Sequence, residues 1–252
     1  MRVKGKGRGR PLSKGISTEP KPLINACGPV GFSPVRPYHI LEKTMALQVV
    51  PLCVVHGRLV DRFWGLTHWD GHPARGRFYA LAEATGGDRQ GLACWALEAL
   101  RRSIGGGRHL SPATLRKALG ECHRTLWAAN QEVPPEGRAG VSLLCLLVRD
   151  AEVVAAGCGH LLLVGWSRYG LHPLMPTPAS PLGLTPELRP TTAYQGLEPG
   201  EALLAVVGPR AGSLPHGALE AALSSPVEGA RRRLSLLFRS EHSLTALLIA
   251  HP

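Results

Sequence analysis

The sequence has no apolar run long enough to cross a membrane. Its longest run, VSLLCLLV at residues 141–148, spans eight residues, whereas a helix needs roughly 20 to cross a bilayer. The basic N-terminus is not followed by the apolar stretch of a secretory signal either. We therefore expect a protein that stays in the cytoplasm and has no membrane partner.

Closely spaced cysteine pairs are also missing. Zinc sites and disulfide frameworks are usually built from such pairs. In a reducing compartment, isolated cysteines among apolar residues are most simply buried small side chains. The six cysteines that we interpret in this way are Cys27, Cys53, Cys94, Cys122, Cys145 and Cys158.

Aspartate is scarce and unevenly placed. The chain has four aspartates, Asp61, Asp70, Asp88 and Asp150, and none lies beyond position 150. A site that needs aspartates from the C-terminal half of the chain therefore lacks them.

The first 44 residues differ in composition from the rest. They hold nine Lys or Arg and two Glu, so +7 of the formal net charge of +11 lies there, with five of the six lysines. Gly, Pro and basic residues without an apolar period predict a disordered tail over residues 1–44. The change in composition predicts a domain boundary near Met45.

The tail has more than one interpretation. Its KGKGRGR segment at residues 4–10 could neutralise several phosphates of a nucleic acid. No aromatic residues alternate with the basic ones to stack on bases, however. A solvated tail, or an extension upstream of a natural start at Met45, is therefore the favoured interpretation.

Residues 45–252 show the pattern of one folded domain. Strands are predicted at 46–55, 76–84, 141–148, 153–159, 160–166, 171–174, 201–208 and 243–250, from β-branched and apolar runs. Apolar spacing predicts helices at 88–104, from the N-cap Ser111 onwards, at 214–225 and at 225–238. Ser225 and Glu228 have the spacing of a capping box around Pro226.

The order of these elements predicts the fold class. Runs of antiparallel strands separated by helix pairs favour an α+β fold, a layered α-β-β-α sandwich of two mostly antiparallel sheets flanked by helices. The strands are nearly all apolar, so both faces of each sheet should be covered. The proline-rich stretch 175–192 is expected to be an irregular surface excursion.

Six segments in order resemble the metal-dependent protein phosphatases, the protein phosphatase 2C or PPM-type class and its bacterial relatives. FYALAEATGGDRQGLACWALEAL at 78–100 resembles the family's strand, Asp-Gly, Gly-Gly and helix. VVAAGCGHLLLVGWSRYGLHPL at 153–174 resembles its Gly-Asp hairpin and the Ala-Gly-His version of the phosphatases that control sigma factors. The other segments are RAGVSLLCLL at 138–147, SPLGL at 180–184, LEPGEALLAVVG at 197–208 and HSLTALLIA at 242–250.

The resemblance covers about residues 50 to 250 and implies phosphoester hydrolysis by water held between two Mg or Mn ions. Such hard ions prefer oxygen ligands, mainly carboxylates. The family's ligand motifs fall on four residue pairs of this chain. These are Glu83 and Ala84, Gly159 and His160, Val207 and Gly208, and His242 and Ser243.

The ligand positions depart from the family's pattern. Glu83 keeps a carboxylate, but Val207 and His242 stand where the family has aspartates of the C-terminal half. Arg58 is a possible phosphate-binding residue, and Asp61 a possible acid, in a segment that aligns loosely. Each of these residues can also be an ordinary loop or surface residue.

We therefore expect no cofactor, with Mn or Mg if the protein is active. A less favoured alternative is a zinc site formed by Glu83, His160 and His242, because zinc accepts nitrogen as well as oxygen ligands.

Two functions follow from this reasoning. The favoured one is a pseudophosphatase, a signalling module that binds a protein, phosphorylated or not. The alternative is an active metal-dependent serine/threonine protein phosphatase with an unusual ligand set. Tyr169 and the prolines of 176–190 are a possible partner-binding flap beside the cleft, since loops on rigid scaffolds carry recognition. Arg231, Arg232 and Arg233 are expected to form a solvated basic face.

Deleting residues 1–44 should leave the melting temperature almost unchanged, because a segment without an apolar period contributes little to a core. Thermal unfolding of the full and shortened chains measures this directly. A fall of many degrees would show that the tail packs on the domain.

Overall fold

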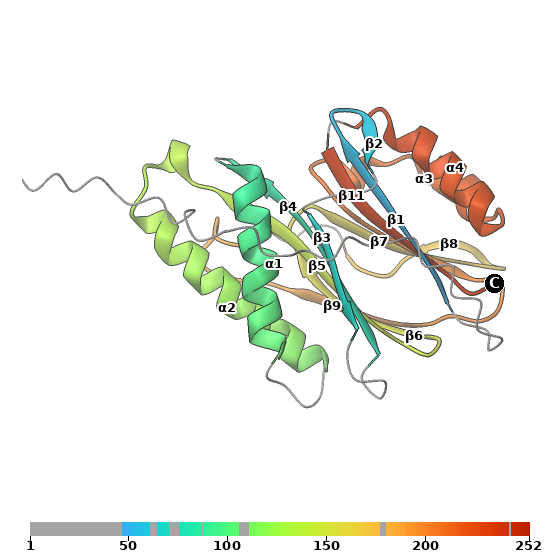
Figure 1. Ribbon diagram of the computed structural model, residues 1–252, viewed down its shortest axis with the longest axis horizontal. Helices are drawn as coiled ribbons and strands as arrows, with labels where there is room; N and C mark the ends of the chain where they lie inside the picture. Colours follow the sequence, from blue (N-terminus) through green and yellow to red (C-terminus); the bar gives the residue numbers. More distant parts are fainter. Residues whose placement is uncertain are drawn as a thin grey trace, which may run out of the picture.

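A computed structural model of the chain describes residues 47–60, 65–70, 76–86, 88–105, 111–176, 180–241 and 243–252. Two antiparallel sheets face each other, and a pair of helices covers the outer face of each (Figure 1). The α+β, α-β-β-α prediction is therefore confirmed. The tail predicted for residues 1–44 lies outside the described residues.

Each sheet is assembled from strands that are distant in sequence. The first sheet has the order β2 (Arg58–Val60), β1 (Gln48–Val55), β11 (Ser243–Ala250), β10 (Ala202–Val207), β7 (Leu161–Ser167) and β8 (Gly170–Pro173). The second has the order β3 (Leu66–Asp70), β4 (Arg77–Thr85), β5 (Gly140–Arg149), β6 (Glu152–Cys158) and β9 (Thr191–Gly196). All pairings between these strands are antiparallel.

Both faces of the central strands are buried. Successive side chains of a strand point to opposite faces, so Leu81 of β4 lies in the core between the sheets, whereas Ala82 lies under the helices. On the first sheet, Leu247 of β11 faces the other sheet and Leu248 faces its own helices. Three apolar layers result, which is why the strands are nearly continuous apolar runs.

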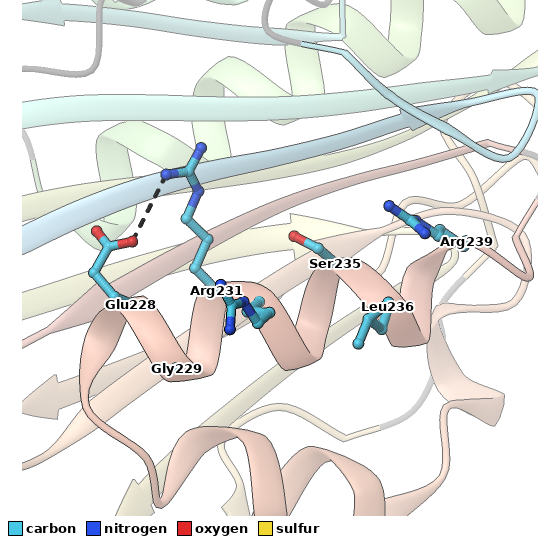
Figure 2. A pocket seen from close by; sticks show the side chains of 7 residues that line it. Glu228, Gly229, Arg231, Ser235, Leu236 and Arg239 are labelled. Atoms are coloured by element: carbon cyan, nitrogen blue, oxygen red, sulfur yellow. Dashed lines mark ion pairs between the residues drawn. The ribbon is translucent and has the colours of Figure 1, made fainter.

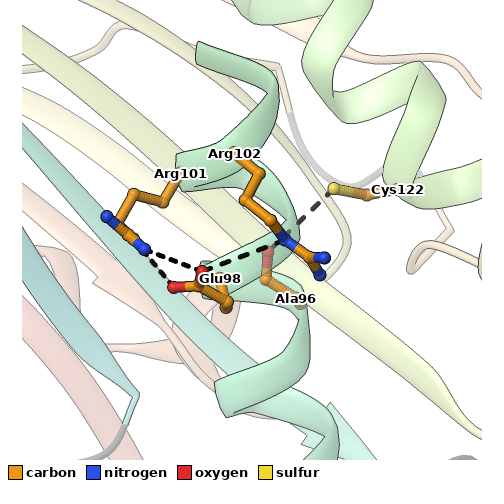
Figure 3. Close-up of polar contacts among 5 residues, drawn as sticks. All are labelled: Ala96, Glu98, Arg101, Arg102 and Cys122. Atoms are coloured by element: carbon orange, nitrogen blue, oxygen red, sulfur yellow. Dashed lines mark hydrogen bonds and ion pairs between the residues drawn. The ribbon is translucent and has the colours of Figure 1, made fainter. Parts of the chain in front are cut away.

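The helices α1 (Arg89–Gly105) and α2 (Pro112–Gln131) cover the second sheet. The predicted N-cap is confirmed, since the Ser111 side chain accepts a hydrogen bond from the Thr114 N–H at 3.2 Å. The two helices also meet directly, with the Cys122 thiol 4.0 Å from the Ala96 carbonyl oxygen (Figure 3).

The outer side of α1 carries an ion-pair cluster. Arg101 Nε donates to Glu98 Oε2 at 2.8 Å, and Arg102 Nε lies 3.9 Å from Glu98 Oε1 (Figure 3). The hydrogen bond from Arg101 is the main reason that the pKa of Glu98 is lowered. The two arginines are exposed and Glu98 is only half-buried, so the pairs contribute little to stability.

The helices α3 (His216–Leu223) and α4 (Val227–Phe238) cover the first sheet. The predicted capping box is wrong. Pro226 occupies the N-cap of α4 without a side-chain cap, and the Ser225 hydroxyl donates instead to the Ala221 carbonyl of α3 at 3.2 Å. The Ser225 N–H also donates to the Ala222 carbonyl at 3.1 Å, so the polar groups of Ser225 cap the end of α3 rather than the start of α4.

The stretch 175–192 departs from the prediction of a surface excursion. Met175 and Leu182 are buried, and Thr191 begins β9, which pairs with β6. Leu182 also exchanges two backbone hydrogen bonds with Val141 of β5, at 2.8 and 3.2 Å. Strands β2, β3 and β9 were not predicted, because they are short or half-exposed and lack an apolar run.

The cysteine prediction is confirmed for the five cysteines that the structure describes, all of which are buried. Burial raises the pKa of Cys53, Cys122 and Cys158 to about 12, so these thiols stay protonated and unreactive. Cys27 lies outside the described residues.

Leu97 and Leu126 are predicted core positions, and both are buried on the paired helices. Replacing either with alanine should lower the free energy of unfolding by about 2 to 5 kcal/mol, the usual range for a core leucine. Leu236→Ala is the matched control, because Leu236 is exposed on α4. Denaturant unfolding measures the free energy of unfolding of all three variants. An unchanged value for the Leu97 or Leu126 variant would contradict tight packing of the helical faces on the sheet.

Candidate functional site

The candidate site lies at one end of the sandwich, where β4 and β11 approach each other from opposite sheets. The alternation along β4 directs Glu83 into the space between the sheets, on the same side as Leu81. Ser243, the first residue of β11, donates its hydroxyl to Glu83 Oε1 at 2.7 Å. This hydrogen bond joins the two sheets across 160 positions of sequence.

The Glu83 carboxyl is nearly out of reach of solvent. Its residue is 3% exposed, and its second oxygen, Oε2, has no hydrogen-bond partner among the described residues. An ionised carboxylate in such a place is costly, because burial removes its hydration. The pKa of Glu83 is raised for this reason, and the Ser243 hydrogen bond and the charge of Arg89 offset only part of the effect.

Other polar side chains share this buried end. Ser142 lies opposite Glu83 on β5, and Thr245 follows Ser243 on the same face of β11. Both are buried, and Thr245 Oγ1 has no hydrogen-bond partner within the described part of the chain. Sequence reasoning missed Ser142 and Thr245. Their signal was the two-residue alternation, which places them on the inward face of strands that are otherwise apolar.

The turn between β6 and β7 packs against the site and makes hydrogen bonds to it. Gly159 has a φ of +88°, and a Cβ there would lie 2.5 Å from Ser142 Oγ, so the turn needs glycine. The next residue, His160, donates its backbone N–H to Ser142 Oγ at 2.9 Å, and its carbonyl accepts the Gly208 N–H at 3.1 Å. The turn thus ties the ends of β5, β7 and β10 together.

Two predicted ligand positions carry no ligand atom in their side chains. Val207, at the end of β10, is fully buried in the core between the sheets, opposite Leu161 and Thr245. Ala84 follows Glu83, but its side chain lies on the other face of β4, under the helices. The structure therefore brings Glu83 and Val207 to the same end of the inner core, as the alignment requires.

Arg58 lies at the same end of the first sheet. It pairs with Val55 of β1, and Val55 pairs with Ser243 of β11, so the three residues form one row across the sheet. Neighbouring strands are about 4.8 Å apart, which puts the Arg58 backbone roughly 10 Å from that of Ser243. Arg58 is exposed. Asp61 and His242, the other predicted residues of this region, lie outside the described residues.

The predicted flap is wrong for Tyr169. Strand β7 starts at Leu161, opposite Val207, and runs away from the site, so the turn that holds Tyr169 lies at the opposite end of the sheet. Tyr169 is 84% exposed, with the Arg168 guanidinium 4.8 Å from its ring centre. Antiparallel register, which the sequence motif did not reveal, decides this placement.

The part of the proline-rich segment that reaches the site end is clamped to α2. Asn130 Nδ2 donates to the Gly183 and Ala139 carbonyls at 2.7 Å each, and its Oδ1 accepts the Ala139 N–H at 3.1 Å. His123 Nδ1 accepts the Gly183 N–H at 3.3 Å. Residues 182 and 183 are therefore fixed rather than flap-like, while residues 177–179 lie outside the described residues.

The described residues do not fit a two-metal centre. Among them, no group of three or more His, Cys, Asp or Glu side chains is arranged to hold a metal ion. One oxygen of Glu83 already accepts the Ser243 hydroxyl, and Val207, at the same end of the inner core, supplies no ligand atom. One member of the predicted zinc group of Glu83, His160 and His242, namely His242, lies outside the described residues.

No family model and no curated protein matches this sequence. Solved structures do match the fold. PppA of Pseudomonas aeruginosa, described as a key regulatory component of T6SS, matches with a TM-score of 0.61 and 18% identity, over 81% of this chain and 97% of PppA.

Bacterial serine/threonine phosphatases match with similar TM-scores. The serine/threonine phosphatase PstP/Ppp of Mycobacterium tuberculosis has a TM-score of 0.58 at 16% identity, over 81% of this chain and 98% of its own. The S. agalactiae serine/threonine phosphatase has 0.65 at 12% identity, over 82% and 100%. The PstP catalytic domain has also been solved with two manganese ions. The chain therefore has the fold of the PPM-type serine/threonine phosphatases.

The raised pKa of Glu83 predicts a pH dependence of stability. Above the ordinary value of 4.5, the unfolded chain releases this proton more readily than the folded one. The stabilising contribution is complete below pH 4.5 and is lost as the pH rises through the raised pKa. Glu83→Gln still accepts the Ser243 hydroxyl but cannot ionise.

We therefore expect Glu83→Gln to be at least as stable as the parent at neutral pH, with the difference vanishing below pH 4.5. Melting temperatures measured across this range test the expectation. Glu132→Gln, which alters an exposed carboxyl, is the control for the loss of one negative charge. A clear loss of stability in Glu83→Gln at neutral pH would show that the ionised carboxylate is favoured.

Proposed function

We propose that this chain is a pseudophosphatase, a phosphatase-like domain that has lost metal-dependent hydrolysis and regulates by binding a protein in the cytoplasm. The observation that carries the proposal is the buried hydrogen bond between Ser243 and Glu83, which lies where a two-metal centre would need carboxylates. The Ser243 hydroxyl already occupies one of the two Glu83 oxygens that could bind a metal ion.

The chemistry of the site supports this proposal. Two-metal hydrolysis needs oxygen ligands on both sides of a bridging water, and these are mainly carboxylates. Val207 supplies only hydrocarbon, and its neighbours Thr245 and Leu161 are an alcohol and another hydrocarbon. A buried carboxyl with a raised pKa also holds its proton more tightly, which weakens it as a ligand.

A regulatory role agrees with the preserved fold. The sandwich keeps both sheets, both helix pairs and the ordered β6–β7 turn, although the ligand positions have changed. PppA, a protein of this fold, is described as a regulatory component. Arg58 remains exposed beside the former site and could contact a phosphorylated side chain, because arginine binds phosphate with paired hydrogen bonds.

The unmodified protein should show no Mg- or Mn-dependent hydrolysis of para-nitrophenyl phosphate, and it should contain no bound metal after purification. Turnover assays and elemental analysis measure the two properties. Robust Mn-dependent turnover that Glu83→Gln abolishes would establish the alternative, an active phosphatase. Zinc in the purified protein, lost on replacing His160, would instead support the mixed nitrogen and oxygen site.

The reverse experiment restores the missing ligands. Ala84→Gly, Val207→Asp and His242→Asp together should make the melting temperature rise on adding Mn, since an ion that binds only the folded state stabilises it. The same triple variant with Asn in place of both Asp residues is the matched control, and it should respond much less. Metal analysis of the unmodified protein decides the proposal even if the buried aspartate prevents folding.

A further inference from the structure

The outer face of α4 is the most basic helical surface among the described residues. The helix contains Arg231, Arg232 and Arg233, and Arg239 is its C-cap. The only acid in this stretch is Glu228. All four arginines are exposed, which agrees with the predicted solvated basic face. Figure 2 shows the side chains along this face of the helix.

Two of the arginines already have a local contact. Arg231 Nη1 lies 3.8 Å from Glu228 Oε2 (Figure 2), and Arg233 Nη1 donates to the Ala221 carbonyl of α3. Arg232 and Arg239 make no ion pair or side-chain hydrogen bond with any described residue. They are seven positions apart, so they lie on the same side of the helix, two turns from each other.

An exposed apolar residue stands between these two arginines. Leu236 is four positions after Arg232 and three before Arg239, and it is 57% exposed. The three residues help to line an open hollow of about 570 Å³ that runs along α4 from Glu228 to Arg239. That length corresponds to roughly 16 Å of helix. Leu236 can bury an apolar group of a ligand, and the guanidinium groups of Arg232 and Arg239 on either side can pair with negative charges.

The end of this surface reaches the rim of the former site. A Cβ on Gly57, in the turn between β1 and β2, would lie 3.2 Å from the Arg239 carbonyl oxygen. The next residue along the chain is Arg58, in the same row as Val55 and Ser243. A partner that lies along α4 would therefore end near the β1–β2 turn and Arg58.

We propose that the α4 face of Arg232, Leu236 and Arg239 docks an acidic, amphipathic segment of a protein partner. Carboxylates would pair with the two guanidinium groups, and one apolar side chain would cover Leu236. Charge complementarity selects this occupant. A second copy of the chain is disfavoured, because each copy has a net charge of +11. The proposal rests on the regulatory function above and names its docking surface and partner class.

A nucleic acid fits this face less well. Its phosphates would pair with the arginines, but burying Leu236 against a phosphate backbone gains nothing. No aromatic side chain lines the described part of the hollow to stack on bases. A peptide that supplies both carboxylates and an apolar group uses all three residues.

Fluorescence anisotropy of a labelled model peptide tests the proposal with the full chain. The peptide is a short helix former in which glutamates flank one leucine, a turn away on each side. We expect saturable binding that weakens with salt. Arg232→Glu with Arg239→Glu should weaken it roughly tenfold or more, and Leu236→Ser several-fold. The milder pair Arg232→Ala and Arg239→Ala should also weaken binding.

The matched control is Arg116→Glu with Arg124→Glu, which changes the net charge equally on the exposed side of α2. This variant should bind the peptide as the unmodified chain does. The unmodified chain should bind more weakly when the leucine of the peptide is replaced with serine. Equal losses in both double variants would overturn the proposal, because bulk charge or the basic tail would then explain binding. Absence of binding, or stronger binding of a single-stranded oligonucleotide of equal charge, would also overturn it.

The docking proposal and the proposed function fail separately. Each sample is also assayed for Mn-dependent hydrolysis of para-nitrophenyl phosphate. Turnover with intact peptide binding would refute the pseudophosphatase and leave the docking surface standing. Absence of both turnover and peptide binding would refute only the docking surface.

Discussion

Burial of both sheets on both faces is the constraint on which the rest of this molecule depends. Each central strand must supply apolar side chains alternately to the core between the sheets and to the layer beneath the helices. Few positions remain where a central strand can carry a polar group, and these lie at strand ends. The candidate site follows from this geometry, since Glu83, Ser142, Ser243 and Thr245 all lie near the end of an inward face.

The same constraint makes the site costly for a charge. A strand end that faces the core is dry, so Glu83 gains little from ionising and has a raised pKa. In a two-metal centre, the positive charge of the divalent cations would compensate the buried negative charge of several carboxylates. Here the surrounding groups are the hydroxyls of Ser142, Ser243 and Thr245, the Cys53 thiol and the Val207 side chain. Only the Ser243 hydroxyl donates to the carboxyl, and only to one of its oxygens. The site is therefore suited to a neutral buried carboxyl.

Charged residues are arranged differently on the surface of the molecule and in its interior. The buried end of the inner core holds Glu83, and Glu241, which precedes β11, is also buried and lies 3.7 Å from Arg210. On the outer helix α4, Arg232 and Arg239 flank the exposed Leu236 and make no ion pair with a described residue. The Arg239 backbone lies against the β1–β2 turn, which leads into Arg58. Such a surface is suited to recognition, because rigid helices hold binding groups in place.

Apolar periodicity reports burial directly, so the layered fold, the helices and most strands could be predicted from the amino-acid sequence. The positions of Glu83 and Val207 and the burial of the cysteines could also be predicted from it. Which residues contact one another could not be predicted, because it depends on how distant strands pair. The Ser243–Glu83 hydrogen bond, the inward hydroxyls of Ser142 and Thr245, and the position of Tyr169 at the far end all depend on antiparallel register between distant strands. Local periodicity carries no information on how distant strands pair. The spacing of the motifs could therefore identify a ligand position, but not the residues that surround it in space.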